Sequence, residues 1–438
     1  MIKILDARAL GADAVVAALA RSPEAVAPEI HRAVDEILAA VRARGDAALL
    51  DYTARLDGFA PAAATGLAIA PAELDAAERA VGPEARAALA YAAERIERYH
   101  AAAAPKSWRM TDEHGSVLGQ EVRPLDRVGI YVPGGRAAYP STVLMTAVPA
   151  RVAGVREIVL VTPPGPGGRV EPAVLAAARI AGVTEGWRVG GAQAVAALAY
   201  GTATIRRVDK IVGPGNIYVA LAKARVFGEV GIDMVAGPSE VVVVADGAAD
   251  PGWVAGDLLA QAEHDPMARA VLITDSGELI PRVAAALERQ LAALPRRAIA
   301  AQALEANGAL VRVASLDDAV ELANRLAPEH LELMVKVPAA LLARVRHAGA
   351  VFMGGHTPEV VGDYVAGPNH VLPTAGTARF ASPLGTEDFV KRSSVIEYSP
   401  SGLASALPHL RALSRIEGLG GHGRAAELRL ETDGGTSG

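Results

Sequence analysis

Two side chains in the second half of the chain have the types and spacing of half a metal site. The stretch Asp257-Leu-Leu-Ala-Gln-Ala-Glu-His-Asp-Pro266 has apolar residues on one side and a closing proline, which predicts the last turns of a helix. Gln261 and His264 are three residues apart, so a helix would bring an amide oxygen and an imidazole nitrogen to one point. An ordinary helix end with a capping histidine is the alternative, and on this stretch alone it is the more common structure.

A second candidate is the adjacent pair Glu329 and His330, just before a predicted strand. On an extended backbone these side chains point to different sides, so one can activate a water while the other accepts a substrate proton. Acid–histidine neighbours are common, however, and the pair alone does not establish catalysis. Further polar candidates stand in glycine-rich segments, where a polar side chain is either solvated or functional; they are Asp363, His370, Glu417 and His422.

Glycine-containing loops follow predicted strands at Pro133-Gly-Gly135, Gly190-Gly191 and Gly213-Pro-Gly215. At such places backbone N–H groups and the positive end of a helix dipole can meet a phosphate. None completes G-x-G-x-x-G, because Tyr218 stands where the third glycine belongs, and no Walker lysine motif is present. Each loop alone could be an ordinary turn, but three at corresponding sheet ends favour a crevice for a nucleotide.

The predicted secondary structure that positions these residues changes from helices to alternating strands and helices along the chain. Residues 1–117 are predicted to form a helical N-terminal arm, used for packing or dimerisation. From about residue 118, short strands alternate with helices of about ten residues, which implies parallel sheets. We therefore predict an α/β fold with two adjacent Rossmann-like, doubly wound units. Residues 118–235 would bind the nucleotide, and residues 236–380 would hold the metal and catalytic side chains.

The predicted C-terminal part, residues 381–438, is a small tail domain. A helix is expected from Leu403 to Ile416, followed by a break at the glycine-rich segment 418–422 and a frayed end from Thr432. A histidine flanked by glycines, as His422 is, is more often a flexible surface residue than a ligand.

Composition narrows the function classes. The 438 residues are 51% hydrophobic and carry 49 acidic against 43 basic side chains, with no long basic run, so neither nucleic acid nor an anionic membrane is an expected partner. The start lacks a signal-peptide pattern and no apolar run reaches membrane-spanning length, which predicts a cytoplasmic protein. With no cysteine, the chain has no disulfide and no thiol nucleophile, and any zinc must use His, carboxylate or amide ligands.

A series of longer motifs stands in order along nearly the whole chain: Val128-Gly-Ile-Tyr-Val-Pro-Gly-Gly135, Pro140-Ser-Thr-Val-Leu-Met145, Gly190-Gly-Ala-Gln-Ala194, Val212-Gly-Pro-Gly-Asn216, Ile232-Asp-Met-Val-Ala-Gly-Pro-Ser-Glu240, Gln261-Ala-Glu-His264, Ala327-Pro-Glu-His-Leu-Glu332, Gly367-Pro-Asn-His370, Thr386-Glu-Asp-Phe389 and Glu417-Gly-Leu-Gly-Gly-His422. Together they resemble the histidinol dehydrogenases, zinc- and NAD-dependent enzymes of histidine biosynthesis. The resemblance implies one zinc per subunit, whose ligands would be Gln261, His264, Asp363 and His422.

The resemblance also implies the other roles. Glu329 would activate water and His330 would accept protons, and both, like the zinc ligands, would lie at the substrate. The further substrate contacts would be Ser239, His370 and Glu417, and the NAD⁺ contacts would be Tyr131, Gln193 and Asn216. In that family the last zinc ligand and the last substrate contact come from the partner subunit, which implies a homodimer with shared active sites.

The reaction implied is the oxidation of L-histidinol to L-histidine through histidinaldehyde, with two NAD⁺ and one water. Many enzymes that oxidise aldehydes use a cysteine; this chain has none, so the second oxidation is expected to use a hydrated aldehyde, with Glu329 as the base. The alternatives are a related zinc- and NAD-dependent dehydrogenase of another small amino or polyol alcohol, a zinc hydrolase, and a binder without activity. His370 and Glu417 favour histidinol, the three loops argue against a hydrolase, and the Glu–His pair argues against a mere binder.

Overall fold

The structure is a computed structural model, and it describes residues 2–19, 27–134, 138–235 and 237–431. The chain divides into two compact units, the first formed by residues 1–103 and 125–389 and the second by residues 104–124 and 390–438. Gly135, Arg136 and Ala137 of the first predicted glycine loop and its insert, and the predicted frayed end from Thr432, lie outside the described residues.

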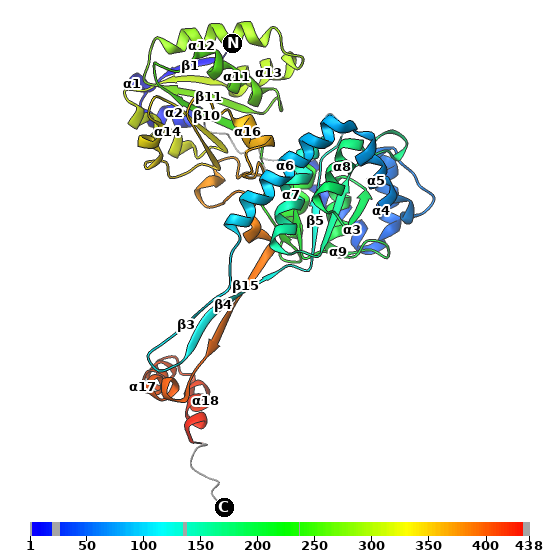
Figure 1. Cartoon of the computed structure of the whole chain (residues 1–438), viewed down its shortest axis with the longest axis vertical. Helices are drawn as coiled ribbons and strands as arrows, with labels where there is room; N and C mark the ends of the chain where they lie inside the picture. The colour runs from blue at the N-terminus through cyan, green and yellow to red at the C-terminus, as the bar shows by residue number, and fades with distance from the viewer. Residues whose placement is uncertain (1, 20–26, 135–137, 236, 432–438) are drawn as a thin grey trace, which may run out of the picture. The chain divides into compact units, whose positions relative to one another are not determined.

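The first unit contains two six-stranded sheets, with helices along both sides of each (Figure 1). The first sheet has the order β2-β7-β6-β5-β8-β9. Its strands are β2 (Ala68–Ile69), β5 (Arg127–Tyr131), β6 (Glu157–Thr162), β7 (Glu185–Arg188), β8 (Lys210–Val212) and β9 (Gly231–Ile232). All neighbours pair in parallel except β2 with β7, and the strand order reverses between β5 and β8.

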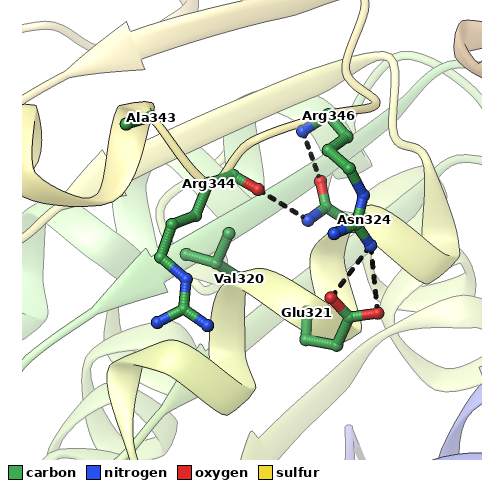
Figure 2. A pocket seen from close by; sticks show the side chains of 6 residues that line it. All are labelled: Val320, Glu321, Asn324, Ala343, Arg344 and Arg346. Carbon is green, nitrogen blue, oxygen red and sulfur yellow. Dashed lines mark hydrogen bonds and ion pairs between the residues drawn. The ribbon is translucent and has the colours of Figure 1, made fainter.

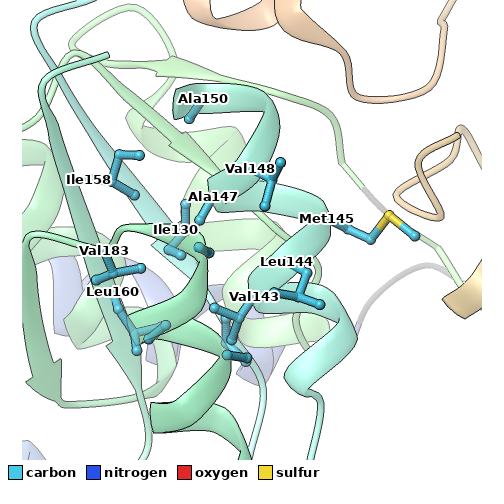
Figure 3. Close-up of a cluster of buried hydrophobic side chains, with 14 of the residues drawn as sticks. Ile130, Val143, Leu144, Met145, Ala147, Val148, Ala150, Ile158, Leu160 and Val183 are labelled. Atoms are coloured by element: carbon cyan, nitrogen blue, oxygen red, sulfur yellow. The ribbon is translucent and has the colours of Figure 1, made fainter. Parts of the chain in front are cut away.

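Helices cover both faces of this sheet, so its central strands β5 and β6 are mostly apolar on both sides, as buried parallel strands usually are. One core includes side chains of α5 (Pro71–Ala80), α6 (Gly82–Ala103), α7 (Pro140–Ala153) and α8 (Pro172–Ala181). Figure 3 shows part of this core, with Val143, Leu144 and Ala147 of α7 beside Ile130 and Leu160. The other core includes side chains of α3 (Pro28–Arg44), α4 (Asp46–Asp57), α9 (Gly191–Tyr200) and α10 (Ile217–Val226).

The second sheet has the order β1-β12-β11-β10-β13-β14 and is parallel throughout. Its strands are β1 (Lys3–Asp6), β10 (Glu240–Ala245), β11 (Arg269–Thr274), β12 (Ala309–Arg312), β13 (His330–Met334) and β14 (Ala350–Met353). One face packs on α11 (Pro251–Ala262), α12 (Leu279–Leu291) and α13 (Arg297–Asn307), and the other on α2 (Ala12–Leu19), α14 (Leu316–Leu326) and α15 (Pro338–Leu342). The short helices α1 (Ala7–Leu10) and α16 (Glu359–Tyr364) and the 3-10 turns Ala64–Leu67, Pro166–Gly168, Thr377–Arg379 and Thr386–Phe389 complete this unit.

The start of the chain differs from the predicted helical arm. Residues 3–6 form β1, which pairs with residues 309–312 at the edge of the second sheet. Four residues are too few to show strand periodicity, and their partner lies about three hundred positions away, so only the folded chain reveals this strand.

In its described residues, 104–124 and 390–431, the second unit contains a three-stranded antiparallel sheet and two helices (Figure 1). Its elements are β3 (Trp108–Thr111), β4 (Val117–Pro124), β15 (Val390–Glu397), α17 (Pro400–Ile416) and α18 (Gly420–Glu431). The strand at residues 117–124 therefore pairs with β15, although the pattern placed residues from 118 onward with the parallel strands. No helix in the described part of the chain is long and apolar enough to cross a membrane.

Candidate active site

The Glu–His pair is buried at the amino end of β13. Glu329 and His330 are 5% and 6% exposed. The turn that leads to them begins at Ala327, which ends α14 with a φ of 47°, a left-handed conformation that is rare for residues other than glycine. Pro328 O accepts from Gly349 N at 2.9 Å and Glu329 O accepts from Ala350 N at 2.9 Å, so the segment that leads into β14 holds the backbone of the pair.

Backbone groups of Glu240, the first residue of β10, orient both side chains. Glu240 N donates to Glu329 Oε2 at 2.9 Å, and His330 Nδ1 lies 3.1 Å from Glu240 O. A carbonyl oxygen only accepts, so Nδ1 carries the proton and Nε2 is left as the basic nitrogen. Burial lowers the pKa of His330, and the charge of Asp363 raises it by a smaller amount. The net lowering favours a neutral imidazole that can accept a proton.

The side chain of Asn324 holds the segment that contains Arg344 and Arg346 (Figure 2). Asn324, which is buried in α14, donates to Arg344 O at 2.9 Å and accepts from Arg346 N at 2.7 Å. These bonds fix the segment that leads to Gly349, beside a hollow of about 160 Å³. Arg346, which lines the hollow, is already ion-paired with Glu321 (Figure 2). We therefore interpret the hollow as part of this support and not as a second site.

Three buried acids form a linked group that reaches His330 through Glu359, and sequence analysis gave none of them a role. Glu359 Oε2 is 3.9 Å from His330 Nδ1, and Glu359 N donates to Glu332 Oε1 at 2.9 Å. Burial raises the pKa of Glu332 and of Glu359 well above the usual range, and it raises the pKa of Asp257, which hydrogen-bonds Glu332. Because burial disfavours the ionised form of these acids, they favour a charged imidazole less than ordinary carboxylates would. The only signal in the sequence was the two-residue spacing of Glu332 from His330, which places both on one face of a strand.

The predicted zinc ligands of the first unit lie on neighbouring elements. Gln261 is 1% exposed in the last turn of α11, and its Nε2 has no hydrogen-bond partner among the described residues. The helix ends at Ala262, so exposed His264 lies just beyond it and not on the helix as its spacing predicted. Asp363 lies in α16, and both Asp363 and His264 influence the pKa values of His330 and His370, so these groups are near one another.

The remaining predicted ligand and one substrate contact belong to the second unit. Exposed His422 is in the first turn of α18, which begins at Gly420, so this residue is helical and not part of a flexible break. Glu417 is exposed at the C-terminal end of α17. Within the described ranges, no group of three His, Asp or Glu side chains could hold a metal.

The predicted substrate contact His370 is held in one tautomer. Its Nδ1 donates to Asp363 O at 3.0 Å, so Nε2 accepts from the hydroxyl of Thr142 at 3.3 Å. Thr142 is in the first turn of α7, which packs on the first sheet, and Asn369 Nδ2 donates to Met145 O of the same helix at 2.6 Å. Sequence analysis did not single out Thr142, because its partner is 228 positions away. Ser239 directly precedes β10, and its backbone O accepts from Arg269 N.

The three predicted NAD⁺ contacts line one cavity of about 1060 Å³ at the carboxyl ends of β5, β7 and β8. The glycines Gly134 and Gly191 of two predicted loops also line it. Tyr131 OH accepts from Gly191 N at 3.0 Å. The Asn216 side-chain oxygen caps α10, accepting from Tyr218 N and Val219 N, so the Asn216 amide N–H groups are the ones that can face a ligand.

Gly213 is fixed by a buried ion pair. Lys223 Nζ donates to Gly213 O at 2.8 Å, Asp233 Oδ2 accepts from Gly213 N at 2.8 Å, and the two side chains are paired and 2% and 1% exposed. Gly213 has a φ of 106°, and a Cβ there would lie 2.2 Å from Tyr131 O. Only glycine therefore fits at the point where the strand order reverses.

We expect Gly213→Ala to raise the KM for NAD⁺ at least tenfold, because the added carbon must push the loop away from Tyr131. Initial rates at varied NAD⁺ measure this. Gly228→Ala is the matched control, since Gly228 has a φ of 104° but no atom within 4 Å of an added Cβ. Equal effects of the two substitutions would contradict a role for the contact with Tyr131.

Comparison with known proteins agrees with the resemblance seen in the motifs. The family model described as "Histidinol dehydrogenase" matches residues 20–430. Histidinol dehydrogenase of Geobacter metallireducens is 52% identical over 99% of both chains, and that of Chromobacterium violaceum is 56% identical over 92% of this chain and 93% of its own. The crystal structure of histidinol dehydrogenase from Elizabethkingia anophelis superposes with a TM-score of 0.94 at 34% identity, over 99% of both chains. The chain therefore belongs to the histidinol dehydrogenase family (EC 1.1.1.23), the oxidoreductases of histidine biosynthesis.

Proposed function

We propose that this histidinol dehydrogenase converts L-histidinol to L-histidine in two NAD⁺-dependent oxidations at one zinc-containing site per subunit. The observation that carries the proposal is the buried Glu329–His330 pair, with the imidazole held by Glu240 O in the tautomer that leaves Nε2 basic. A cavity large enough for a dinucleotide, with the three predicted contact residues in its lining, supports NAD⁺ as the oxidant.

The chain's own groups supply the proton transfers. In the first step, His330 Nε2 accepts the hydroxyl proton of histidinol as the aldehyde forms. In the second, Glu329 takes a proton from water as the water oxygen bonds to the aldehyde carbon, and His330 returns the proton from the first step to the aldehyde oxygen, which gives the hydrate. The neutral His330 Nε2 then accepts a hydroxyl proton of this hydrate as the second hydride leaves. When bound, NAD⁺ accepts the hydride released in each step.

Zinc fits the residues proposed to hold it. Gln261 is buried and its Nε2 has no partner among the described residues, so its amide oxygen is available as a ligand, while His264 and Asp363 are close enough to His330 to act on its pKa; amide oxygen, imidazole and carboxylate are all possible zinc ligands. Gln261, His264 and Asp363 would come from one chain and His422 from a second copy. When bound, the zinc would hold the imidazole and amine of the substrate, orienting it toward Glu329 and His330.

A homodimer with shared active sites is proposed from the second unit. None of its described residues buries an apolar side chain; the buried positions are Ser116, Gly119, Gly402, Ser414 and Gly423. Large apolar side chains are instead exposed, among them Trp108, Met110, Ile396, Leu413 and Ile416 at 51–81%. So many exposed apolar side chains are typical of an interface that another protein surface buries. In a homodimer, the commonest kind of oligomer, a second copy of the chain provides that surface.

The remaining proposals concern organisation. Each six-stranded sheet is proposed as a Rossmann-like, doubly wound unit, supported by the single reversal of strand order beside β5 and beside β10. Residues 118–235 would be the nucleotide-binding unit and residues 236–380 the metal and catalytic unit. Residues 1–117 would be the N-terminal arm, and residues 381–438 the tail that reaches the partner. A cytoplasmic location is proposed as well.

The stoichiometry tests the proposed function. We expect two NADH for each L-histidinol consumed, and loss of turnover when a chelator removes the metal, with recovery on addition of Zn²⁺. NADH absorbance, product analysis and metal analysis of the same samples measure this. A single NADH per histidinol, or full turnover by metal-free protein, would contradict it.

A further inference from the structure

Two acidic side chains of the N-terminal region, Glu36 and Asp57, line the nucleotide cavity, where the sequence had predicted only a packing arm. Asp57 is the last residue of α4, and it lines the cavity together with Tyr131 and Gln193. Asp57 precedes Gln193 by 136 residues and is far from the glycine loops in the sequence. Sequence analysis therefore did not place it at the cavity.

The contact between Asp57 and Gln193 defines how the glutamine amide is oriented. Gln193 Nε2 donates to Asp57 Oδ2 at 3.3 Å. An ionised carboxylate only accepts hydrogen bonds, so it selects the amide orientation that places Nε2 toward Asp57 and Oε1 away from it. Gln193 is 1% exposed, and its Oε1 is buried without a hydrogen-bond partner among the described residues.

A buried acceptor without a donor is unfavourable, and a ligand that brings a donor removes the penalty. Gly191 leaves room for this oxygen, because a Cβ at Gly191 would lie 2.5 Å from Gln193 Oε1. Gln193 therefore brings to the cavity lining an acceptor that Asp57 orients and that no described group of the protein uses.

The electrostatic surroundings of Asp57 agree with a group inside the cavity and not on the open surface. Burial raises the pKa of Asp57 to about 6, although the bond from Gln193 lowers it, so the carboxyl is mostly ionised at pH 7. Burial and, to a smaller extent, the charge of Asp57 raise the pKa of Tyr131 to about 12. The other charged side chains that line the cavity are Glu36, Arg55, Arg169 and Glu171.

We propose that Asp57 is a positioning residue of the cofactor site, which holds the Gln193 amide so that Oε1 accepts a hydrogen bond from a hydroxyl or amide N–H of the dinucleotide. This inference rests on the proposed function in one respect, that NAD⁺ occupies this cavity. Asp57 acts through Gln193, so its effect must disappear when Gln193 is absent.

A double-mutant cycle on the full chain tests this dependence. The dissociation constant of NAD⁺ is measured by calorimetry for wild type, Asp57→Ala, Gln193→Ala and the double variant. We expect each single substitution to weaken NAD⁺ binding about tenfold, and the double variant to bind within about twofold of Gln193→Ala. In steady-state assays the loss should fall on the KM for NAD⁺ much more than on kcat or on the KM for histidinol.

Two further variants separate positioning from folding. Asp57→Asn keeps the size of the side chain but, having both a donor and an acceptor, can bond either orientation of the Gln193 amide, so we expect it to weaken NAD⁺ binding as well. Asp51→Asn, on the same helix and paired with Arg44 outside the cavity, should bind NAD⁺ like wild type.

The outcomes distinguish this inference from the proposed function. Unchanged NAD⁺ affinity in Asp57→Ala, or additive losses in the double variant, overturns the inference while wild-type turnover of histidinol leaves the proposed function intact. A wild-type protein that binds no NAD⁺ in the calorimeter overturns both.

Discussion

Replacing Glu329 by glutamine is expected to slow the oxidation of histidinaldehyde by about 100-fold to 10,000-fold, the usual contribution of a general base. The oxidation of histidinol to the aldehyde should fall by less than about tenfold, because His330 remains as the base for that step. The substitution keeps the fold, since a glutamine oxygen can still accept from Glu240 N, which donates to Glu329 at 2.9 Å. Single-turnover rates of NADH formation, started separately from the alcohol and from the aldehyde, measure the two steps.

The control for this experiment is Glu321→Gln. Glu321 lies on α14 in the same unit, but its carboxylate is half-exposed and pairs with Arg346. This variant loses a glutamate charge without touching the pair, so both half-reactions should match wild type. If Glu329→Gln slowed both oxidations equally, the carboxylate would be orienting the substrate or His330 and not activating water.

Much of the parallel part of the fold could be predicted from local patterns. The predicted alternation of short strands with helices of about ten residues is present, for example in the helices Pro172–Ala181, Ile217–Val226 and Leu316–Leu326 and the strand Glu240–Ala245. Strands covered on both faces are continuous apolar runs that end at glycine or proline, so they are visible without any knowledge of their neighbours. The motifs then identified the family, and relatives of over 50% identity along nearly the whole chain confirm that assignment.

Two errors occurred where a strand depends on a distant partner, and a third occurred at a helix end. Residues 3–6 are a strand only because β12 pairs with them, and residues 117–124 leave the parallel sheet because β15 pairs with them. His264 lies beyond its helix because α11 stops at Ala262, two residues earlier than the spacing implied. Helix ends are set by local capping and packing, which the apolar pattern does not record.

The supporting residues of the site could not have been found in the same way. Asn324 fixes the segment that leads to Gly349, Thr142 contacts His370, and Asp57 contacts Gln193. The last two contacts span 228 and 136 positions, and none of these three side chains stands in a motif that demands its chemistry. Reactive residues can be predicted from sequence motifs, whereas the residues that position them are identified only from contacts in the folded structure.

The residues proposed to form the site are distributed over both units of the chain. Glu329, His330, Gln261, His264 and Asp363 belong to the first unit, and Glu417 and His422 belong to the second. The second unit buries no apolar side chain of its own among its described residues, so its stability must come from another surface. If a second copy provides that surface, assembly and catalysis depend on the same contact, and a monomer would have an incomplete zinc site.

Mixing two inactive variants tests this sharing directly. We expect His330→Asn and His422→Asn to be inactive alone and to regain about a quarter of wild-type activity after equal amounts exchange subunits. Random exchange makes half of the dimers mixed, and in each mixed dimer one site combines the intact His330 of one chain with the intact His422 of the other. The second site in that dimer carries both substitutions and stays inactive.

A matched pair gives the opposite result if the reasoning is correct. His422→Asn mixed with Glu417→Gln should regain nothing, because both residues lie in the second unit and every site then receives a damaged tail. If each chain used its own tail, neither mixture would recover activity, since every chain would keep its own defect. Exchange is verified by mass spectrometry of differently labelled chains, so recovery in the first mixture alone identifies an active site built from two subunits, and its absence despite verified exchange contradicts one.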